Sequence, residues 1–185
     1  FDNKKYAFAA DYIRLYALYN YGGIYLDTDV EVLKSLNDLL TRDLMLGLDS
    51  AGFLEVASFG AEKGNKLIGL FLKEYENKSF KKRDGTFEIT PLPKVISTIL
   101  KKYGFTVREM KDKNDFVTDE DVINALSREY FGAKSYATGQ ILCTPNTYTI
   151  HHFAGSWLDE QSVWVHDKSK KFNKVPYANL IVVFV

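Results

Sequence analysis

Residues 21–29 read Tyr-Gly-Gly-Ile-Tyr-Leu-Asp-Thr-Asp, and this stretch decides the fold and chemistry that we expect. The apolar run Ile24–Leu26 predicts a short strand, which two carboxylates follow. Side chains two residues apart on an extended chain point to the same side, so Asp27 and Asp29 are expected to lie together. Paired carboxylate oxygens suit Mn²⁺ or Mg²⁺, and we predict a metal site here. A solvated pair of aspartates is the alternative, because an isolated D-x-D is a common pattern.

The residues before this stretch predict a helix over 7–20. Apolar side chains recur there at helical spacing, and Gly22 or Gly23 is expected to end the helix, since glycine reaches the left-handed conformation. Asp11 and Arg14 lie three residues apart, at the margin of the apolar stripe. A charged pair at such a margin forms a half-buried salt bridge or lines a cleft, and the sequence leaves both alternatives open.

The rest of the chain alternates short predicted strands with predicted helices. We expect strands over 43–48, 55–59, 140–143 and 147–152, helices over 66–75 and 94–103, and charged loops over 78–85 and 111–121. This alternation favours an α/β sheet whose functional site lies at the carboxyl edge of its strands. With 185 residues, of which 46% are hydrophobic, residues 1–185 are expected to form a single domain.

Composition excludes several classes of partner. The chain has 24 basic and 24 acidic residues, so no overall field attracts nucleic acid or anionic lipid. No apolar run approaches the roughly 18 residues that a membrane span needs, and no signal peptide is visible. The one cysteine, Cys143, has no partner for an internal disulfide, which favours a reducing compartment. We therefore expect a cytoplasmic protein, free or peripheral at the inner face of the membrane.

Two separated blocks resemble a known family. The first joins Ala10, Asp11 and Arg14 to the stretch 22–29, and the second is the run 148–157, Tyr-Thr-Ile-His-His-Phe-Ala-Gly-Ser-Trp. Together they resemble the D-x-D sugar-transferase family, which includes bacterial capsular and cell-surface polysaccharide glycosyltransferases and fungal initiating mannosyltransferases. The glucosyltransferase domains of large clostridial toxins are a more distant likeness. Two blocks in the right order are more specific than the D-x-D alone.

The resemblance implies a GT-A-like fold, a mixed sheet flanked by helices. In that family a strand and a helix that hold the nucleotide base come first, whereas this sequence opens on Phe1 close to the Asp11 helix. We therefore expect the chain to be truncated at its N-terminus and to lack the first β-α unit. A chain without that unit is expected to bind its donor weakly.

The resemblance also implies roles for residues of both blocks. Asp27, Asp29 and Arg14 would be catalytic. The donor would be held by residues of both blocks, namely Asp11, Arg14, Tyr25, Asp27, Ser156 and Trp157. Ser156 and Trp157 match a pair whose hydroxyl and indole N–H bind the donor's β-phosphate, and both are hydrogen-bond donors.

A histidine is expected to complete the metal site of Asp27 and Asp29. Adjacent residues of a strand point to opposite faces, so only one of His151 and His152 is expected to meet the metal. We prefer His152, because the run from His152 to Gly155 matches the family's His-aromatic-x-Gly segment, and keep His151 as second choice.

The expected function is a metal-dependent glycosyltransferase that moves a hexose from a UDP- or GDP-sugar to a saccharide or glycolipid acceptor. Retention of anomeric configuration and a role in surface polysaccharide synthesis are implied by the resemblance. Two alternatives remain. A haloacid-dehalogenase-like phosphatase is one, because the run 24–30 partly matches its nucleophile motif. A non-catalytic sugar- or nucleotide-binding module is the other.

Overall fold

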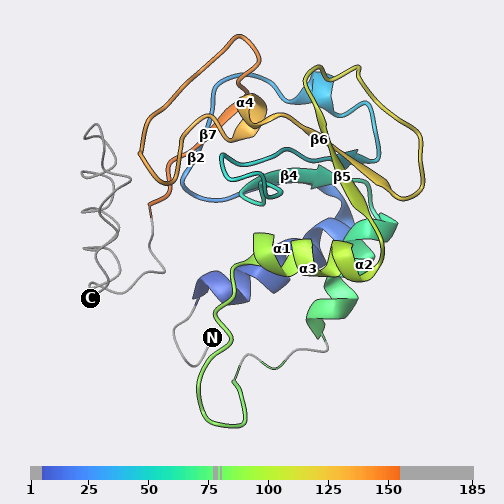
Figure 1. Cartoon of the computed structure of the whole chain (residues 1–185), viewed down its shortest axis with the longest axis vertical. Coiled ribbons are helices and arrows are strands. Elements are labelled where there is room, and N and C mark those ends of the chain that lie inside the picture. Colours follow the sequence, from blue (N-terminus) through green and yellow to red (C-terminus); the bar gives the residue numbers. More distant parts are fainter. Residues whose placement is uncertain (1–5, 77–78, 80, 155–185) are drawn as a thin grey trace.

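The computed structural model describes residues 6–76, 79 and 81–154, and the side chains of the first helix from residue 9 onward (Figure 1). The predicted phosphate-binding pair Ser156 and Trp157 lies outside the described residues. Their roles therefore stay predictions. The described part is a mixed α/β fold with small sheets and four α-helices, which confirms the predicted fold class.

Three long helices gather on one side of the strands (Figure 1). They are α1 (Tyr6–Tyr21), α2 (Lys66–Glu76) and α3 (Leu92–Lys102), and each confirms a predicted helix to within two residues at either end. A short helix, α4 (Arg128–Phe131), and the 3₁₀ turn η1 (Asn37–Leu39) were not predicted. Both are too short to show helical periodicity in sequence.

The central sheet has three antiparallel strands in the order β1-β4-β3. β1 (Gly23–Leu26) pairs with β4 (Ser58–Ala61), with Leu26 opposite Ser58. β3 (Leu44–Met45) pairs with the other edge of β4. The D-x-D follows the last residue of β1 directly, so it lies at the carboxyl end of this strand, as predicted.

Two further strand pairs complete the sheet structure. β5 (Thr106–Met110) and β6 (Val122–Leu126) are parallel, and β6 is joined to the chain after β3 by hydrogen bonds between Leu126 and its neighbours there. β2 (Val30–Val32) pairs antiparallel with β7 (Thr149–His151). This last pair places the end of the described chain beside the D-x-D.

The strands differ from the sequence predictions at several points. The predicted strand 43–48 is only two residues long, and the one predicted over 55–59 begins at Ser58. The strand predicted over 140–143 is wrong, since only an isolated bridge at Ile141 occurs there. β5 and β6 were missed because a parallel pair depends on partners brought together by the chain between them.

The main hydrophobic core lies between the three long helices and the central sheet. Leu15 of α1, Phe59 of β4, Ile68 of α2 and Ile96 of α3 are all at most 2% exposed and belong to one packed cluster. Burial of each such side chain contributes about 1.5–3 kcal/mol. The core therefore fixes α1 against β1 and β4, and with it the side chains that precede the D-x-D.

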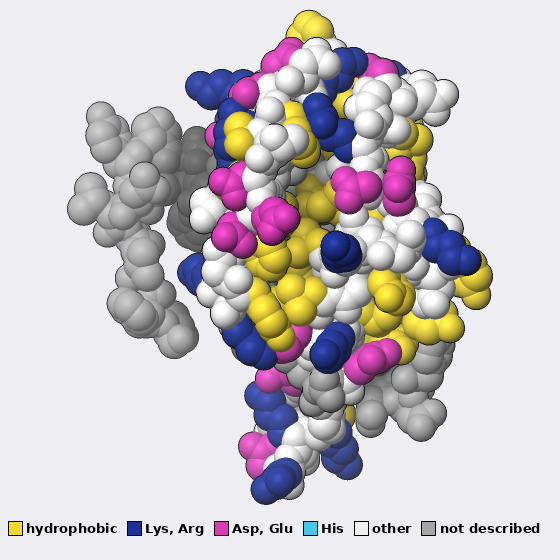
Figure 2. Space-filling model, turned by 90° about the vertical axis from the view of Figure 1, so that its right-hand side faces the viewer, with side chains coloured by type: hydrophobic (Ala, Val, Ile, Leu, Met, Phe, Trp, Pro, Cys, Tyr) yellow, Lys and Arg dark blue, Asp and Glu magenta, His cyan; other side chains and the backbone are white. Residues whose placement is uncertain are grey.

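The surface carries charges of both signs. On the face shown in Figure 2, acidic and basic side chains are interspersed, and hydrophobic side chains lie between them. This mixture agrees with the balanced composition and offers no field of one sign on that face. Among the described residues, helices lack the length and apolar character required to cross a membrane.

Gly22 fixes the turn from α1 into β1. Its φ is +71°, and its N–H donates to Leu18 O, which closes the helix. A Cβ built there would lie 2.6 Å from the backbone nitrogen of Lys63. The turn therefore needs glycine both for its backbone conformation and for the close approach of a second backbone.

We expect Gly22→Ala to lower the free energy of unfolding by about 2–5 kcal/mol, from the cost of positive φ plus a backbone clash. Gly104→Ala is the matched control. Gly104 also follows a helix at positive φ (+80°), but a Cβ there would meet no atom within 4 Å. It should cost only about 1–2 kcal/mol. Urea denaturation followed by circular dichroism measures the free energy of unfolding of both variants. Equal losses of stability would show that the close approach of the Lys63 backbone does not constrain residue 22.

Candidate functional site

The D-x-D forms a turn between β1 and β2. The N–H of Asp27 donates to Ala57 O, and the N–H of Val30 donates back to Asp27 O at 3.1 Å. Thr28 and Asp29 thus lie in a turn, and the predicted extended geometry is wrong for these residues. The carboxylates of Asp27 and Asp29 still converge. The turn, and not the alternation of side chains along a strand, brings them to the same side.

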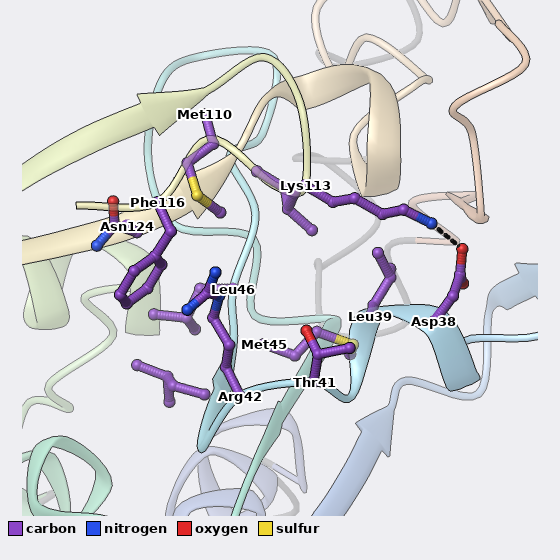
Figure 3. Close-up of a pocket in the computed structure, with 12 residues that line it drawn as sticks. Asp38, Leu39, Thr41, Arg42, Met45, Leu46, Met110, Lys113, Phe116 and Asn124 are labelled. Atoms are coloured by element: carbon purple, nitrogen blue, oxygen red, sulfur yellow. Dashed lines mark hydrogen bonds and ion pairs between the residues drawn. The ribbon is translucent and has the colours of Figure 1, made fainter. Parts of the chain in front are cut away.

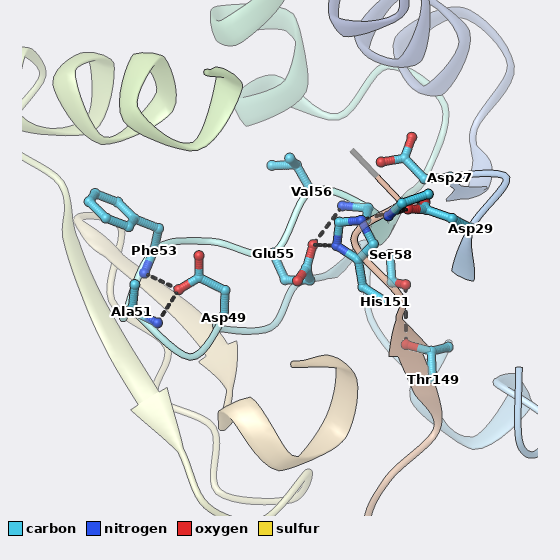
Figure 4. Close-up of polar contacts among 12 residues, drawn as sticks. Asp27, Asp29, Asp49, Ala51, Phe53, Glu55, Val56, Ser58, Thr149 and His151 are labelled. Atoms are coloured by element: carbon cyan, nitrogen blue, oxygen red, sulfur yellow. Dashed lines mark hydrogen bonds and ion pairs between the residues drawn. The ribbon is translucent and has the colours of Figure 1, made fainter. Parts of the chain in front are cut away.

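His151 lies beside both aspartates. Asp27, Asp29 and His151 each offer a ligand atom, and these atoms lie within 4.8 Å of one another (Figure 4). The Nε2 atom of His151 lies 3.5 Å from Asp29 Oδ1. The other oxygen of Asp29 accepts a hydrogen bond from the N–H of Ala154 at 2.8 Å. The second sequence block therefore meets the first at this point.

The choice of His152 as the histidine of this cluster is corrected by the structure. In β7, His151 pairs with Val30, and the next residue points to the opposite face. The Nε2 atom of His152 lies 2.8 Å from Glu31 Oε2, and both of these side chains are exposed. His151 was the second choice from sequence, which gave no register for the strand.

Arg14 joins the predicted helix pair to Asp27. Its guanidinium lies 3.3 Å from Asp11 Oδ1 and 3.3 Å from Asp27 Oδ1, and donates to Val56 O at 2.8 Å. The same group lies over the ring of Tyr25, whose hydroxyl donates to Asp27 Oδ1 at 2.6 Å. The Asp11–Arg14 pair is thus buried and aimed at the D-x-D.

Asp11 is a buried carboxylic acid beside Arg14. It is only 7% exposed, and its carboxylate accepts a hydrogen bond from Tyr75 of α2 at 3.3 Å. Burial raises its pKa from 3.8 to about 6, against the opposing effect of Arg14. Burial also raises the pKa of Tyr25 and of Tyr75 above the usual range. Tyr75 was missed in the sequence, where it reads as one position of an amphipathic helix.

Glu55 is a further residue that sequence reasoning missed. It was predicted to lie within a strand, but it precedes β4 and is only 4% exposed. Its Oε1 accepts the N–H of Ala57 at 2.8 Å and lies 3.5 Å from Nδ1 of His151 (Figure 4). Burial lowers the pKa of His151, but Glu55, Asp29 and Asp27 together raise it above its ordinary value.

The donor set fits a hard divalent cation. Two carboxylates and one imidazole converge, and oxygen and imidazole ligands are suited to Mn²⁺, with oxygen ligands also suited to Mg²⁺. The carboxylate of Glu55 also lies 3.5 Å from the second ring nitrogen of His151, the position where metal-binding histidines commonly have a carboxylate. Asp27, Asp29 and His151 therefore have the ligand chemistry that such a site requires.

A small hollow is lined by residues that do not belong to this cluster. Figure 3 shows it between η1, β3 and β6, with Arg42, Phe116 and Asn124 on its walls. Arg42 lies over the ring of Phe116 at 3.6 Å, and Lys113 is paired with Asp38. Its volume of about 30 Å³ holds one or two waters but no nucleotide sugar. The D-x-D region, where the three candidate metal ligands converge, is the better candidate for a donor site.

Comparison with protein families gives one match. Residues 1–46 match the family described as glycosyltransferase sugar-binding region containing DXD motif. The matched segment holds α1, β1, the D-x-D and β2, and therefore Asp11, Arg14, Tyr25, Asp27 and Asp29. This confirms the resemblance to DXD-containing glycosyltransferases and supports a glycosyltransferase sugar-binding region at the start of the chain. Curated proteins and solved structures gave no match.

The raised pKa of Asp11 predicts a specific pH dependence of stability. Because the folded protein binds this proton more tightly than the unfolded chain, the contribution of Asp11 is fully present below about pH 4. It is lost as the pH rises through about 6. The free energy of unfolding of wild type minus that of Asp11→Asn should fall by up to about 3 kcal/mol across this window.

Urea denaturation of both proteins at several pH values between about 4 and 7 measures this difference. Tyr75→Phe is a useful second variant, because it removes the hydrogen bond to Asp11 but leaves the carboxyl group in place. It should retain the fall. Parallel pH profiles for wild type and Asp11→Asn would show that Asp11 titrates normally in the folded protein.

Proposed function

We propose that this chain is the catalytic part of a metal-dependent glycosyltransferase that moves a hexose from a UDP- or GDP-sugar to a saccharide or glycolipid acceptor. The convergence of Asp27, Asp29 and His151 at the carboxyl end of β1 carries the proposal. The DXD family match of residues 1–46 supports it independently. Two aspartates inside the matched segment and a histidine far outside it form one cluster.

Asp29 and His151, together with Asp27, would hold Mn²⁺ or Mg²⁺. When bound, the ion supplies positive charge that stabilises the departing diphosphate. Asp27 is the least available of the three, since one of its oxygens already accepts the Tyr25 hydroxyl and both lie near Arg14. This arrangement supports a role for Asp29 and His151 as the main ligands and for Asp27 as a link to the donor sugar.

Arg14 and Asp11 would orient the sugar of the donor. Arg14 holds Asp27 and the carbonyl of Val56 in fixed positions, so the polar wall beside the D-x-D is ordered before a donor arrives. Such preorganisation lowers the barrier by positioning the reacting carbon against the acceptor. The proposed retention of configuration, hexose transfer and role in surface polysaccharide synthesis rest on the family resemblance.

A donor screen tests the proposal. Thermal shift with and without Mn²⁺ is measured for UDP- and GDP-sugars, followed by release of the nucleoside diphosphate with saccharide acceptors. A Mn²⁺-dependent stabilisation by one donor and its turnover are expected. A donor that binds with Mn²⁺ but is never turned over favours a binding module instead. Hydrolysis of p-nitrophenyl phosphate with no response to any donor favours the phosphatase.

We expect Asp29→Asn to reduce donor turnover at least about 100-fold, because it removes a charged metal ligand. Glu31→Gln is the matched control. Glu31 lies two residues away, but its carboxylate is exposed and contacts His152 on the opposite face of β2. It should retain turnover within about threefold. Both variants should unfold close to the wild-type temperature, since partly exposed carboxylates contribute little to stability.

Steady-state kinetics at several Mn²⁺ concentrations separates the two variants. Asp29→Asn should also require more Mn²⁺ for half-maximal turnover than wild type does. Turnover and Mn²⁺ dependence that are unchanged in Asp29→Asn would exclude this residue from the metal site. Loss of turnover in Glu31→Gln of the same size would show that the exposed face of β2 is involved instead.

A further inference from the structure

Glu55 is a buried carboxylate next to the proposed metal site. Its side chain is 4% exposed, and one of its oxygens accepts the N–H of Ala57. The residues that follow it are tied to the D-x-D region, since Val56 O accepts from Arg14 and Ala57 O accepts from Asp27. The position of Glu55 relative to the two aspartates is therefore fixed by backbone contacts.

The imidazole of His151 lies between two carboxylates. Its Nδ1 is 3.5 Å from Glu55 Oε1, and its Nε2 is 3.5 Å from Asp29 Oδ1 (Figure 4). Nδ1 is buried and makes no hydrogen bond among the described residues. Buried polar atoms of this kind normally have a partner, and a buried carboxylate needs donors. A proton on Nδ1 directed at Glu55 meets both needs.

We propose that Glu55 is a positioning residue, which holds the proton of neutral His151 on Nδ1 and so directs the lone pair of Nε2 toward the metal. The inference rests on the metal site proposed above and adds a residue outside the DXD-matched segment. Glu55 is better placed for this than Asp29, because its side chain is 4% exposed against 23%, and Asp29 already accepts the N–H of Ala154. The interaction of a proton with a carboxylate is stronger away from water.

A role limited to folding is the competing explanation, and neighbouring Thr149 offers a control for it. Thr149 lies two residues before His151 in β7, and its hydroxyl shares a buried hydrogen bond with Ser58 of β4. Thr149→Val breaks this bond at nearly constant side-chain volume. It therefore weakens the packing of β7 but leaves the two carboxylates around His151 in place.

The test uses Glu55→Gln, Glu55→Ala and Thr149→Val. Nitrogen NMR of the metal-free protein at alkaline pH, where the ring is neutral, reports which nitrogen of His151 is protonated. Titration with Mn²⁺ alone, followed by electron paramagnetic resonance, gives the metal affinity. In wild type the proton should be on Nδ1. Both Glu55 variants should raise the population with the proton on Nε2 and weaken Mn²⁺ binding about tenfold or more.

Thr149→Val should lower the melting temperature but keep the wild-type tautomer and Mn²⁺ affinity within about twofold. Glu55→Gln retains an acceptor for Ala57 N–H, so it gives a result even where Glu55→Ala fails to fold. If every Glu55 variant that folds keeps the wild-type tautomer, the positioning role of Glu55 is overturned. The proposed Mn²⁺ site is then still supported as long as the wild-type protein binds Mn²⁺. A tautomer that depends on Glu55 in a protein with no affinity for Mn²⁺ supports the positioning role and refutes the proposed metal function.

Discussion

The buried guanidinium of Arg14 is the interaction on which the arrangement of this site depends. It is only 5% exposed and contacts carboxylates from α1 and from the D-x-D, together with a carbonyl of the segment 55–57. A buried charge is tolerated only with such partners, so removal of one leaves the others uncompensated. Arg14 thus pairs with Asp11 inside α1, and the same guanidinium fixes the position of Asp27. Structure and proposed chemistry are coupled at one side chain.

The segment 55–57 extends this coupling to the far end of the described chain. Its backbone contacts Arg14 and Asp27, and its first side chain faces His151. The β2–β7 ladder supplies the remaining constraint, because it pairs Val30 with His151 directly after the D-x-D. Two sequence blocks separated by more than 100 residues therefore meet through one short ladder and one connecting segment. Neither block forms the cluster alone.

The residues of the proposed site fall into two groups, those inside the segment that matches the DXD family and those outside it. Residues 1–46 contain both aspartates and the Asp11–Arg14 pair. His151, Glu55 and Tyr75 lie outside that segment, and their contacts with it come from the tertiary structure.

The sequence alone determined the three long helices and the place of the D-x-D. Helical spacing and the glycines after Tyr21 predicted α1, and an apolar run before two carboxylates predicted β1. It also indicated that Asp11 and Arg14 lie at a packed margin, which their burial confirms. These features depend on residues close together in the chain, so local periodicity is enough to reveal them.

Only the tertiary structure decided which side chains surround the D-x-D. Adjacent histidines point to opposite faces, and the choice between His151 and His152 depends on the register with β2, which local sequence does not encode. The same holds for the turn conformation at Asp29 and for Glu55, which reads in sequence as the first residue of a predicted strand. The parallel pair β5–β6 was missed for a related reason. Pairing between distant segments is set by how the whole core packs, and that information is spread over the entire chain.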